Sequence, residues 1–176
     1  MSPQALAAKV RSGEPLQGED FSAMPLDGLD LSGGLFSECR FTRASMTGVQ
    51  LTDAVFERCV FDGAVMDGAQ LGKTSFLRCS LQEAPMHAAR WEGTVAAESD
   101  LRGVQADESV LQEAAFHDCD LGGARFVRAS VTKTIFNDSR IGDADFGEAA
   151  FATGVFFRCD LRETGFLGAR FDNAIF

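Results

Sequence analysis

Large apolar residues recur at every fifth position of this chain from Phe21 to Phe176, and no insertion breaks the register. Thirty of these 32 centre positions are large and apolar; the exceptions are Ala96 and Ala106. From Gly34 to Ala174, the residue two before each centre is always Gly, Ala, Cys, Ser, Thr or Val. Because a small and a large residue two apart point to the same side of an extended chain, the pattern predicts short strands.

A five-residue repeat also predicts corners, because an unbroken strand would turn every second apolar pair outward. Glycines two residues after the centre suit such corners. Examples stand at 28, 48, 68, 103, 123 and 168. The five cysteines all occupy the small position and fall in one column of a 20-residue period, at 39, 59, 79, 119 and 159. Four repeats therefore form one coil, which predicts an all-β, four-sided parallel solenoid of about eight coils stacked about 4.8 Å apart.

Several units resemble the repeats of the pentapeptide-repeat family: Ala-Asp-Phe-Gly-Glu at 144–148, Cys-Asp-Leu-Gly-Gly at 119–123, Cys-Asp-Leu-Arg-Glu at 159–163 and Ala-Arg-Phe-Asp-Asn at 169–173. The resemblance covers about nine-tenths of the chain. It implies a right-handed quadrilateral β-helix. The family motif is structural and implies little about function.

The segment before the repeats has the signals of a short helix. Ser2 suits an N-cap, Pro3 suits the first helical position and Gly13 suits the end. We expect residues 1–18 to be a capping helix with its lead-in, and residues 19–176 to form the β-helix. The last coil presents an unpaired edge, which is one surface where two copies can meet. Whether a further C-terminal segment follows it is left open.

Charge and leader signals narrow the possible partners. A formal net charge of -10 argues against direct binding of nucleic acid or of an anionic membrane. Residues 1–13 contain no apolar run long enough for a signal peptide or a membrane span, so we expect a cytoplasmic protein. An odd number of cysteines then indicates buried free thiols rather than a disulfide framework.

Residues for catalysis are scarce. His87 and His117 fall on different sides of the predicted square, and inward thiols without histidine partners are typical of a core. We therefore expect no enzyme activity, no cofactor and no metal. Trp91 lies in the same coil as Ala96 and Ala106, which favours a locally repacked core over a pocket beside the indole.

Function must then be read from the outward positions, one before each centre, which define four faces. The first face carries Asp20, Arg40, Val60, Ser80, Asp100, Asp120, Arg140 and Asp160. The second carries Pro25, Ser45, Val65, Pro85, Gln105, Arg125, Asp145 and Gly165. The third carries Asp30, Gln50, Gln70, Arg90, Val110, Ser130, Ala150 and Arg170. The fourth carries Leu35, Val55, Ser75, Val95, Ala115, Ile135, Val155 and Ile175.

The fourth face is apolar at seven of its eight outward positions. Phe157, the one Phe outside the centre positions, lies beside it. A continuous apolar stripe of this size is typical of a binding site. The hypothesis is a protein-binding scaffold that uses Leu35, Val55, Val95, Ile135, Val155, Phe157 and Ile175. The alternative explanation is that β-branched residues simply suit strands. The partner's identity is open, and so is the choice between a homodimer through the C-terminal coil or fourth face and another protein.

Two functions follow from the resemblance. The opening, Ser2 to Leu31, is similar to pentapeptide-repeat proteins found beside bacterial effector-secretion genes, which implies an adaptor or chaperone role. Other family members mimic B-form DNA and bind DNA gyrase or topoisomerase IV, giving quinolone-type resistance. That second function needs a consistently acidic surface, for which the candidates are Asp100, Asp107, Glu108, Asp118 and Asp120. Arginines interrupt these faces, and a mixed-sign surface is more often a matter of solubility.

Overall fold

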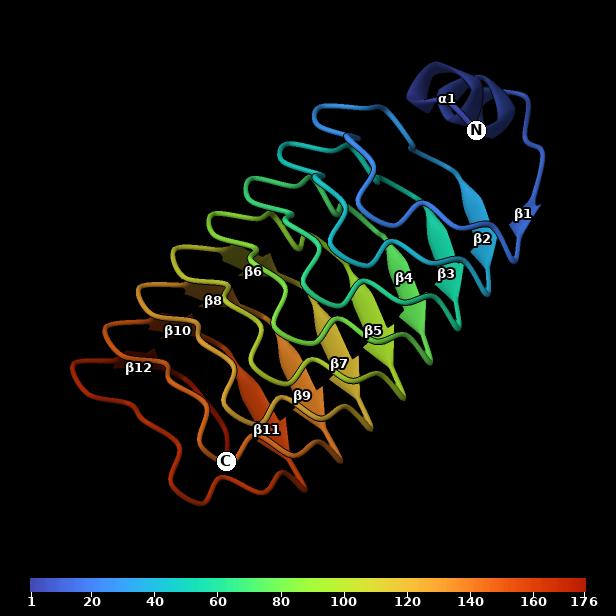
Figure 1. Ribbon diagram of the computed structural model, residues 1–176. Helices are drawn as coiled ribbons and strands as arrows, with labels where there is room; N and C mark the ends of the chain where they lie inside the picture. The colour runs from blue at the N-terminus through green and yellow to red at the C-terminus, as the bar shows by residue number, and fades with distance from the viewer.

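The computed structural model describes residues 1–176 as one short helix followed by a parallel β-solenoid of about eight turns (Figure 1). The helix, α1 (Pro3–Arg11), begins after Ser2, whose side chain accepts a hydrogen bond from the backbone N–H of Ala5. Its residues Leu6 and Val10 are buried in the same core as the first coil. As the sequence predicts, α1 covers one end of the solenoid.

The fourth face is the most regular side, a parallel eight-stranded sheet in the order β1-β2-β3-β4-β5-β7-β9-β11. Every strand pairs with the residue 20 positions along the chain, which confirms four repeats per coil. β1 lies within the segment 1–18 and already pairs with β2. The strands are β1 (Leu16–Gln17), β2 (Leu35–Ser37), β3 (Val55–Glu57), β4 (Ser75–Leu77), β5 (Val95–Ala97), β7 (Ala115–His117), β9 (Ile135–Asn137) and β11 (Val155–Phe157).

The other three sides are less regular. The third face forms a parallel four-stranded sheet only in its C-terminal half, in the order β12-β10-β8-β6. Its strands are β6 (Val110–Gln112), β8 (Ser130–Thr132), β10 (Ala150–Ala152) and β12 (Arg170–Asp172). The first and second faces pair through isolated bridges, such as Asp20 with Arg40 and Pro25 with Ser45. β-Branched outward residues on the fourth face favour the extended backbone, whereas Pro and Gly on the second face do not.

The corners lie where the repeat predicts them. Every residue two after a centre position, from Ala23 to Asn173, has a positive φ between 50° and 74°. Glycine accepts this left-handed conformation freely, but most corners here carry a side chain. Backbone hydrogen bonds to the next coil hold these corners, for example from the N–H of Arg43 to the carbonyl of Asp62, 3.0 Å apart.

The core consists of stacked inward columns. On the fourth face the rings of Phe36 and Phe56 stack with centroids 4.8 Å apart. The column is interrupted at Ala96, where the ring of Trp91 packs against both Phe76 and Phe116. Trp91, Ala96 and Ala106 are all fully buried, so the indole fills the space that the two alanines leave. A locally repacked core therefore explains the disturbed coil.

The cysteine column faces inward. Cys39, Cys59, Cys79 and Cys119 are buried free thiols, and Cys159 in the last coil is half-buried. Each sulfur donates to backbone carbonyls. Ser99 and Ser139 stand in the same column and donate in the same way, which explains how a hydroxyl replaces a thiol there.

Candidate protein-binding face

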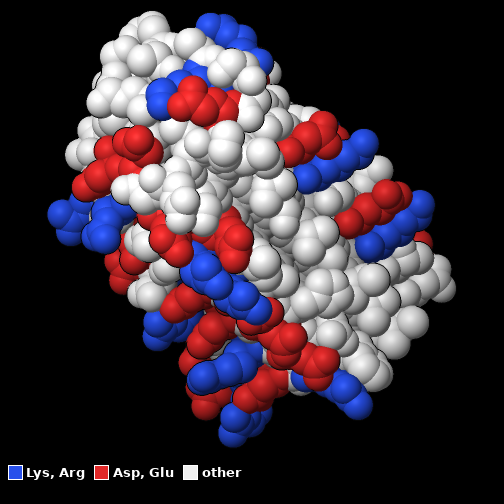
Figure 2. Space-filling view, turned by 90° about the vertical axis from the view of Figure 1, so that its right-hand side faces the viewer, with Lys and Arg blue, Asp and Glu red and all other residues white.

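The fourth face presents its outward side chains to solvent, as predicted from the alternation of the strands. Leu35 is 46% exposed, Val95 39%, Ile135 41% and Ile175 61%, while Val155 is partly covered. Val55 and Phe157 are also exposed. Figure 2 shows this face as an uncharged band between two rows of charged side chains. The structure thus brings all seven predicted residues together on one side of the molecule.

Two corner rows of charged residues border the band. We call the row after the strands the first rim; its members are Glu38, Arg58, Arg78, Glu98, Asp118, Asp138 and Arg158. We call the row before the strands the second rim; its charged members are Asp53, Lys73, Glu113 and Lys133. Within the chain, neighbouring coils pair Arg58 with Glu38, Arg78 with Glu98, Arg158 with Asp138 and Lys133 with Glu113. Asp53, Lys73 and Asp118 form no ion pair within the chain.

A hollow of about 250 Å³ opens at the N-terminal end of the band. Pro15, Leu35, Ser37 and Val55 line it, together with side chains of β1 and β3. Sequence reasoning missed this hollow because residues 1–18 were assigned to a cap. The available signal was Pro15-Leu16, which continues the five-residue register one coil before Leu35.

The acidic surface has a different character, because its carboxylates are used within the fold. Asp100, Asp120 and Asp160 each accept a hydrogen bond from the backbone N–H two residues later. Asp107 instead accepts from the N–H of Val127 in the next coil, at 3.0 Å. These carboxylates pair with corner N–H groups that would otherwise face solvent.

Arginines neutralise most of the acidic candidates. Asp100 pairs with Arg102 at 2.6 Å, Asp107 with Arg125 at 3.1 Å, Glu108 with Arg128 at 2.6 Å and Asp120 with Arg140 at 3.7 Å. Of the five candidates only Asp118 has no cation partner within the chain. In the last coil, hydrogen bonds from Arg162 lower the pKa of Asp160 to about 2. At four of the five candidate positions the surface therefore carries local ion pairs rather than unpaired negative charge.

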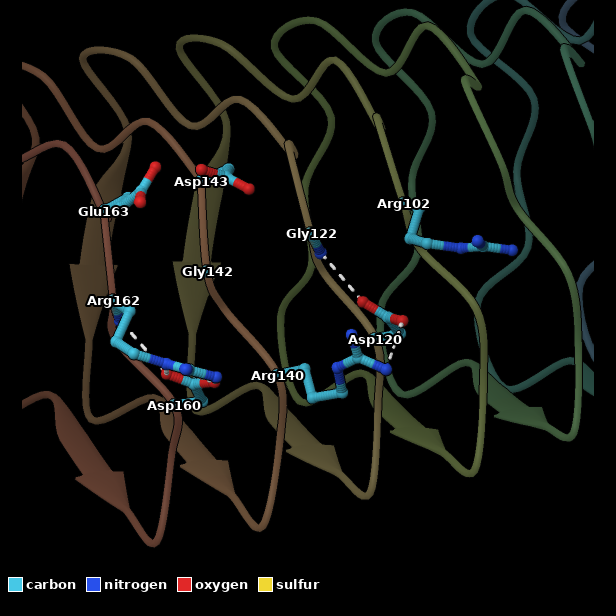
Figure 3. A pocket seen from close by; sticks show the side chains of 9 residues that line it. All are labelled: Arg102, Asp120, Gly122, Arg140, Gly142, Asp143, Asp160, Arg162 and Glu163. Atoms are coloured by element: carbon cyan, nitrogen blue, oxygen red, sulfur yellow. Dashed lines mark hydrogen bonds and ion pairs between the residues drawn. The ribbon is translucent and has the colours of Figure 1, made fainter.

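A polar hollow of about 400 Å³ lies beside the first face (Figure 3). It arises because Gly122 and Gly142 leave a gap between the side chains of Arg102 and Arg162 in one column. Arg140 points to Asp120, and Arg162 points to Asp160. No hydrophobic residue lines the hollow, and two of its arginines, Arg140 and Arg162, are already paired with Asp120 and Asp160.

The remaining reactive groups do not converge. The ring Nδ1 of His87 lies 2.9 Å from a carboxylate oxygen of Asp67, whereas His117 belongs to β7 on another side. No three His, Cys, Asp or Glu side chains form a group that could hold a metal ion. Burial raises the pKa of the Cys119 thiol to about 11, so this sulfur is a neutral core group at pH 7.

Comparisons with known proteins agree with this architecture. The family model described as pentapeptide repeats (8 copies) matches residues 26–58, 39–77 and 109–147, which together are more than half of the chain. The chain belongs to the pentapeptide-repeat family. Proteins of this family are generally non-catalytic. No curated protein matches the chain significantly. No helix of the structure has the length and apolar character needed to cross a bilayer.

Two solved structures share the fold. HetL, a pentapeptide-repeat protein involved in heterocyst differentiation regulation in the cyanobacterium Nostoc sp. strain PCC 7120, is 16% identical, with a TM-score of 0.51 over 99% of this chain and 94% of that chain. A trypsin-treated form of QnrB1, a plasmid-mediated fluoroquinolone resistance protein, is 18% identical, with a TM-score of 0.53 over 90% of this chain and 89% of that chain. At these identities the likeness extends to the fold alone.

Proposed function

We propose that this protein is a non-enzymatic scaffold that binds a protein partner through its fourth face. The single observation that carries the proposal is the exposed apolar row along the eight-stranded sheet, from Leu35 to Ile175. Apolar side chains scattered singly over a surface need no explanation, but a contiguous band with charged edges has the anatomy of an interface. β-Strand propensity alone does not account for it, because the outward rows of the other three faces are mostly polar.

An adaptor or chaperone role in bacterial effector secretion is the narrower form of this proposal, and a cytoplasmic location goes with it. Such a role requires a surface that releases its client. An apolar band of a few hundred Å² suits reversible binding, because stable permanent interfaces bury considerably more area. The opening segment, Ser2 to Leu31, motivates this form through its similarity to proteins found beside effector-secretion genes.

Binding of DNA gyrase or topoisomerase IV through the acidic faces is the competing function. Arginines pair with four of its five candidate acids, which weakens the long-range negative potential that DNA mimicry needs. The shared fold with QnrB1 does not change this, since the fold is common to family members of different function.

The test is affinity capture from the native host with wild type and with the Ile135→Arg/Val155→Arg variant. Both residues point outward, so the fold should survive. The matched control is Ser80→Arg/Ser130→Arg, which adds the same charge on the first and third faces. The captured protein is then purified and titrated. We expect binding to weaken more than tenfold only in the fourth-face variant. Capture of topoisomerase subunits, unaffected by the fourth-face changes, would overturn the proposal.

A further inference from the structure

We propose that the fourth face binds a second copy of this chain, about a two-fold axis that runs parallel to the strands and passes through Val95. The inference rests on the proposed function, because it names the partner of the same face. In this arrangement the two sheets lie face to face with their solenoid axes antiparallel. Each coil then lies opposite the coil that is equally far on the other side of Val95. Such an interface is isologous, so the surface must complement itself.

The rims satisfy that requirement. Rotation about the axis at Val95 places each charged rim residue opposite a rim residue of the second copy that carries the opposite charge. The one exception is Glu98, which lies at the axis and faces Glu98 of the second copy. In each copy, Arg78 lies one coil from this Glu98, and its Nε is 2.8 Å from a carboxylate oxygen of Glu98 in the same chain. The opposed pairs are Glu38 with Arg158, Arg58 with Asp138, Arg78 with Asp118, Asp53 with Lys133, and Lys73 with Glu113.

Three of these charges form no ion pair within the chain: Asp53, Lys73 and Asp118. The proposed axis places each of them against an opposite charge of the second copy. The cations that have partners within the chain remain accessible, since the side chain of Lys133 is 65% exposed and that of Arg158 69%. They can therefore contact a second carboxylate across the interface.

Other arrangements fail the same test. Moving the axis half a coil toward the C-terminus places Arg58 against Arg158, and moving it toward the N-terminus places Glu38 against Asp138. A parallel alignment of the two solenoids places Arg78 against Lys73 and Asp118 against Glu113. Like charges directly opposed across an interface disfavour association. Only one register, with its axis at Val95, matches all five pairs.

One exposed ring and one hollow give an independent indication of the same axis. The outward residues that face each other across it are Leu35 and Val155, Val55 and Ile135, and Ser75 and Ala115. The 53%-exposed ring of Phe157 comes to lie over Ser37, and Ser37 lines the hollow of about 250 Å³.

At the far end of the band, Ile175 comes to lie over Pro15, which lines the same hollow. The one Phe outside the centre positions therefore meets the hollow on this face, at both ends of the dimer. The contact between Phe157 and the hollow is independent of the rim charges and supports the same axis.

The test is sedimentation velocity of the full chain over a range of concentrations, with single and paired charge reversals. Because the axis is two-fold, Asp53→Lys alone creates two repulsive contacts with Lys133, and Lys133→Asp alone creates two with Asp53. The Asp53→Lys/Lys133→Asp variant restores both contacts. We expect each single change to weaken the dimer about tenfold or more, and the double change to return it to within about threefold of wild type.

Two variants that shorten an exposed side chain test the contact between Phe157 and the hollow of the second copy. Phe157→Ser should weaken the dimer about tenfold, whereas Leu167→Ser, at an 89%-exposed residue off the fourth face, should leave it unchanged. A chain that stays monomeric at all concentrations, or a dimer that ignores these changes, overturns the inference. In either case the capture experiment still decides the proposed function, because a different partner lost with Ile135→Arg/Val155→Arg leaves the fourth face as the interface.

Discussion

The first and fourth faces are built from the same five-residue repeat, yet they differ in how their outward side chains are satisfied. On the first face, Asp100 and Asp160 accept backbone N–H groups at the corner and pair with the arginine two residues later. On the fourth face, Val55, Val95 and Ile135 have no counterpart within the chain. The charges of these two acids are matched within the chain, whereas these apolar side chains of the fourth face are not covered by the chain. The difference shows that outward charge in a solenoid can be structural, and it is the reason for proposing the apolar face as the binding surface.

The largest expected effect separates inward from outward positions on the fourth face. Phe56→Ala removes a ring that stacks on both Phe36 and Phe76, so we expect unfolding free energy to fall by about 3–5 kcal/mol. Val55→Arg, one residue earlier, should change it by less than about 0.5 kcal/mol because the side chain points to solvent. Urea unfolding followed by fluorescence measures both, since Trp91 is the only Trp and the chain has no Tyr. Equal losses would contradict the assigned direction of the two side chains.

A smaller effect separates two neighbouring acids of the acidic surface. Asp107→Ala leaves the N–H of Val127 without its partner and should cost about 1–2 kcal/mol. Glu108→Ala removes only an exposed ion pair with Arg128 and should cost less than about 0.5 kcal/mol. The same unfolding measurement distinguishes them. If this surface mimics DNA, both variants should also lose topoisomerase binding together.

The buried cysteine column predicts that the stability of the fold decreases at alkaline pH. The folded pKa of Cys119 is raised from 9.0 to about 11 by burial, so its contribution to stability is complete below pH 9 and is lost as the pH rises toward 11. Cys119→Ser is the matched control, because Ser99 and Ser139 already occupy that column. We expect the stability of wild type relative to this variant to fall by about 1–3 kcal/mol across that range. A constant difference would show that the thiol is not buried as described.

The smallest effect concerns thiol access. Cys159 is half-buried in the last coil, whereas the other four cysteines are buried. Titration with a coloured disulfide reagent at pH 8 should therefore label one thiol per native chain before the other four, and Cys159→Ser should abolish that first phase. Rapid labelling of several thiols would indicate that the coils open readily.

The sequence predicts the fold almost completely because each five-residue repeat has the same pattern of inward, outward and corner positions. The register from Phe21 to Phe176 places every inward residue, and the cysteine column sets four sides per coil. The outward orientation of the fourth-face side chains, from Leu35 to Ile175, follows from the same register. The hollow beside Pro15 and the hydrogen bond from the N–H of Val127 to Asp107 could not be predicted, because both depend on contacts between coils 20 residues apart. The identity of a binding partner could not be predicted either, because the repeat pattern determines only how the chain packs against itself.

Cross-linking at the proposed axis tests most directly whether two copies of this protein associate through their fourth faces. Cys159→Ser removes the accessible thiol, and Val95→Cys then places one thiol at the centre of the band; Ser80→Cys on the first face is the control. A short bis-maleimide should convert the Val95→Cys protein to covalent dimer and leave the Ser80→Cys protein monomeric, because residue 95 meets its own copy only if the two fourth faces pack together. Equal cross-linking of both proteins, or none at residue 95, would contradict the account.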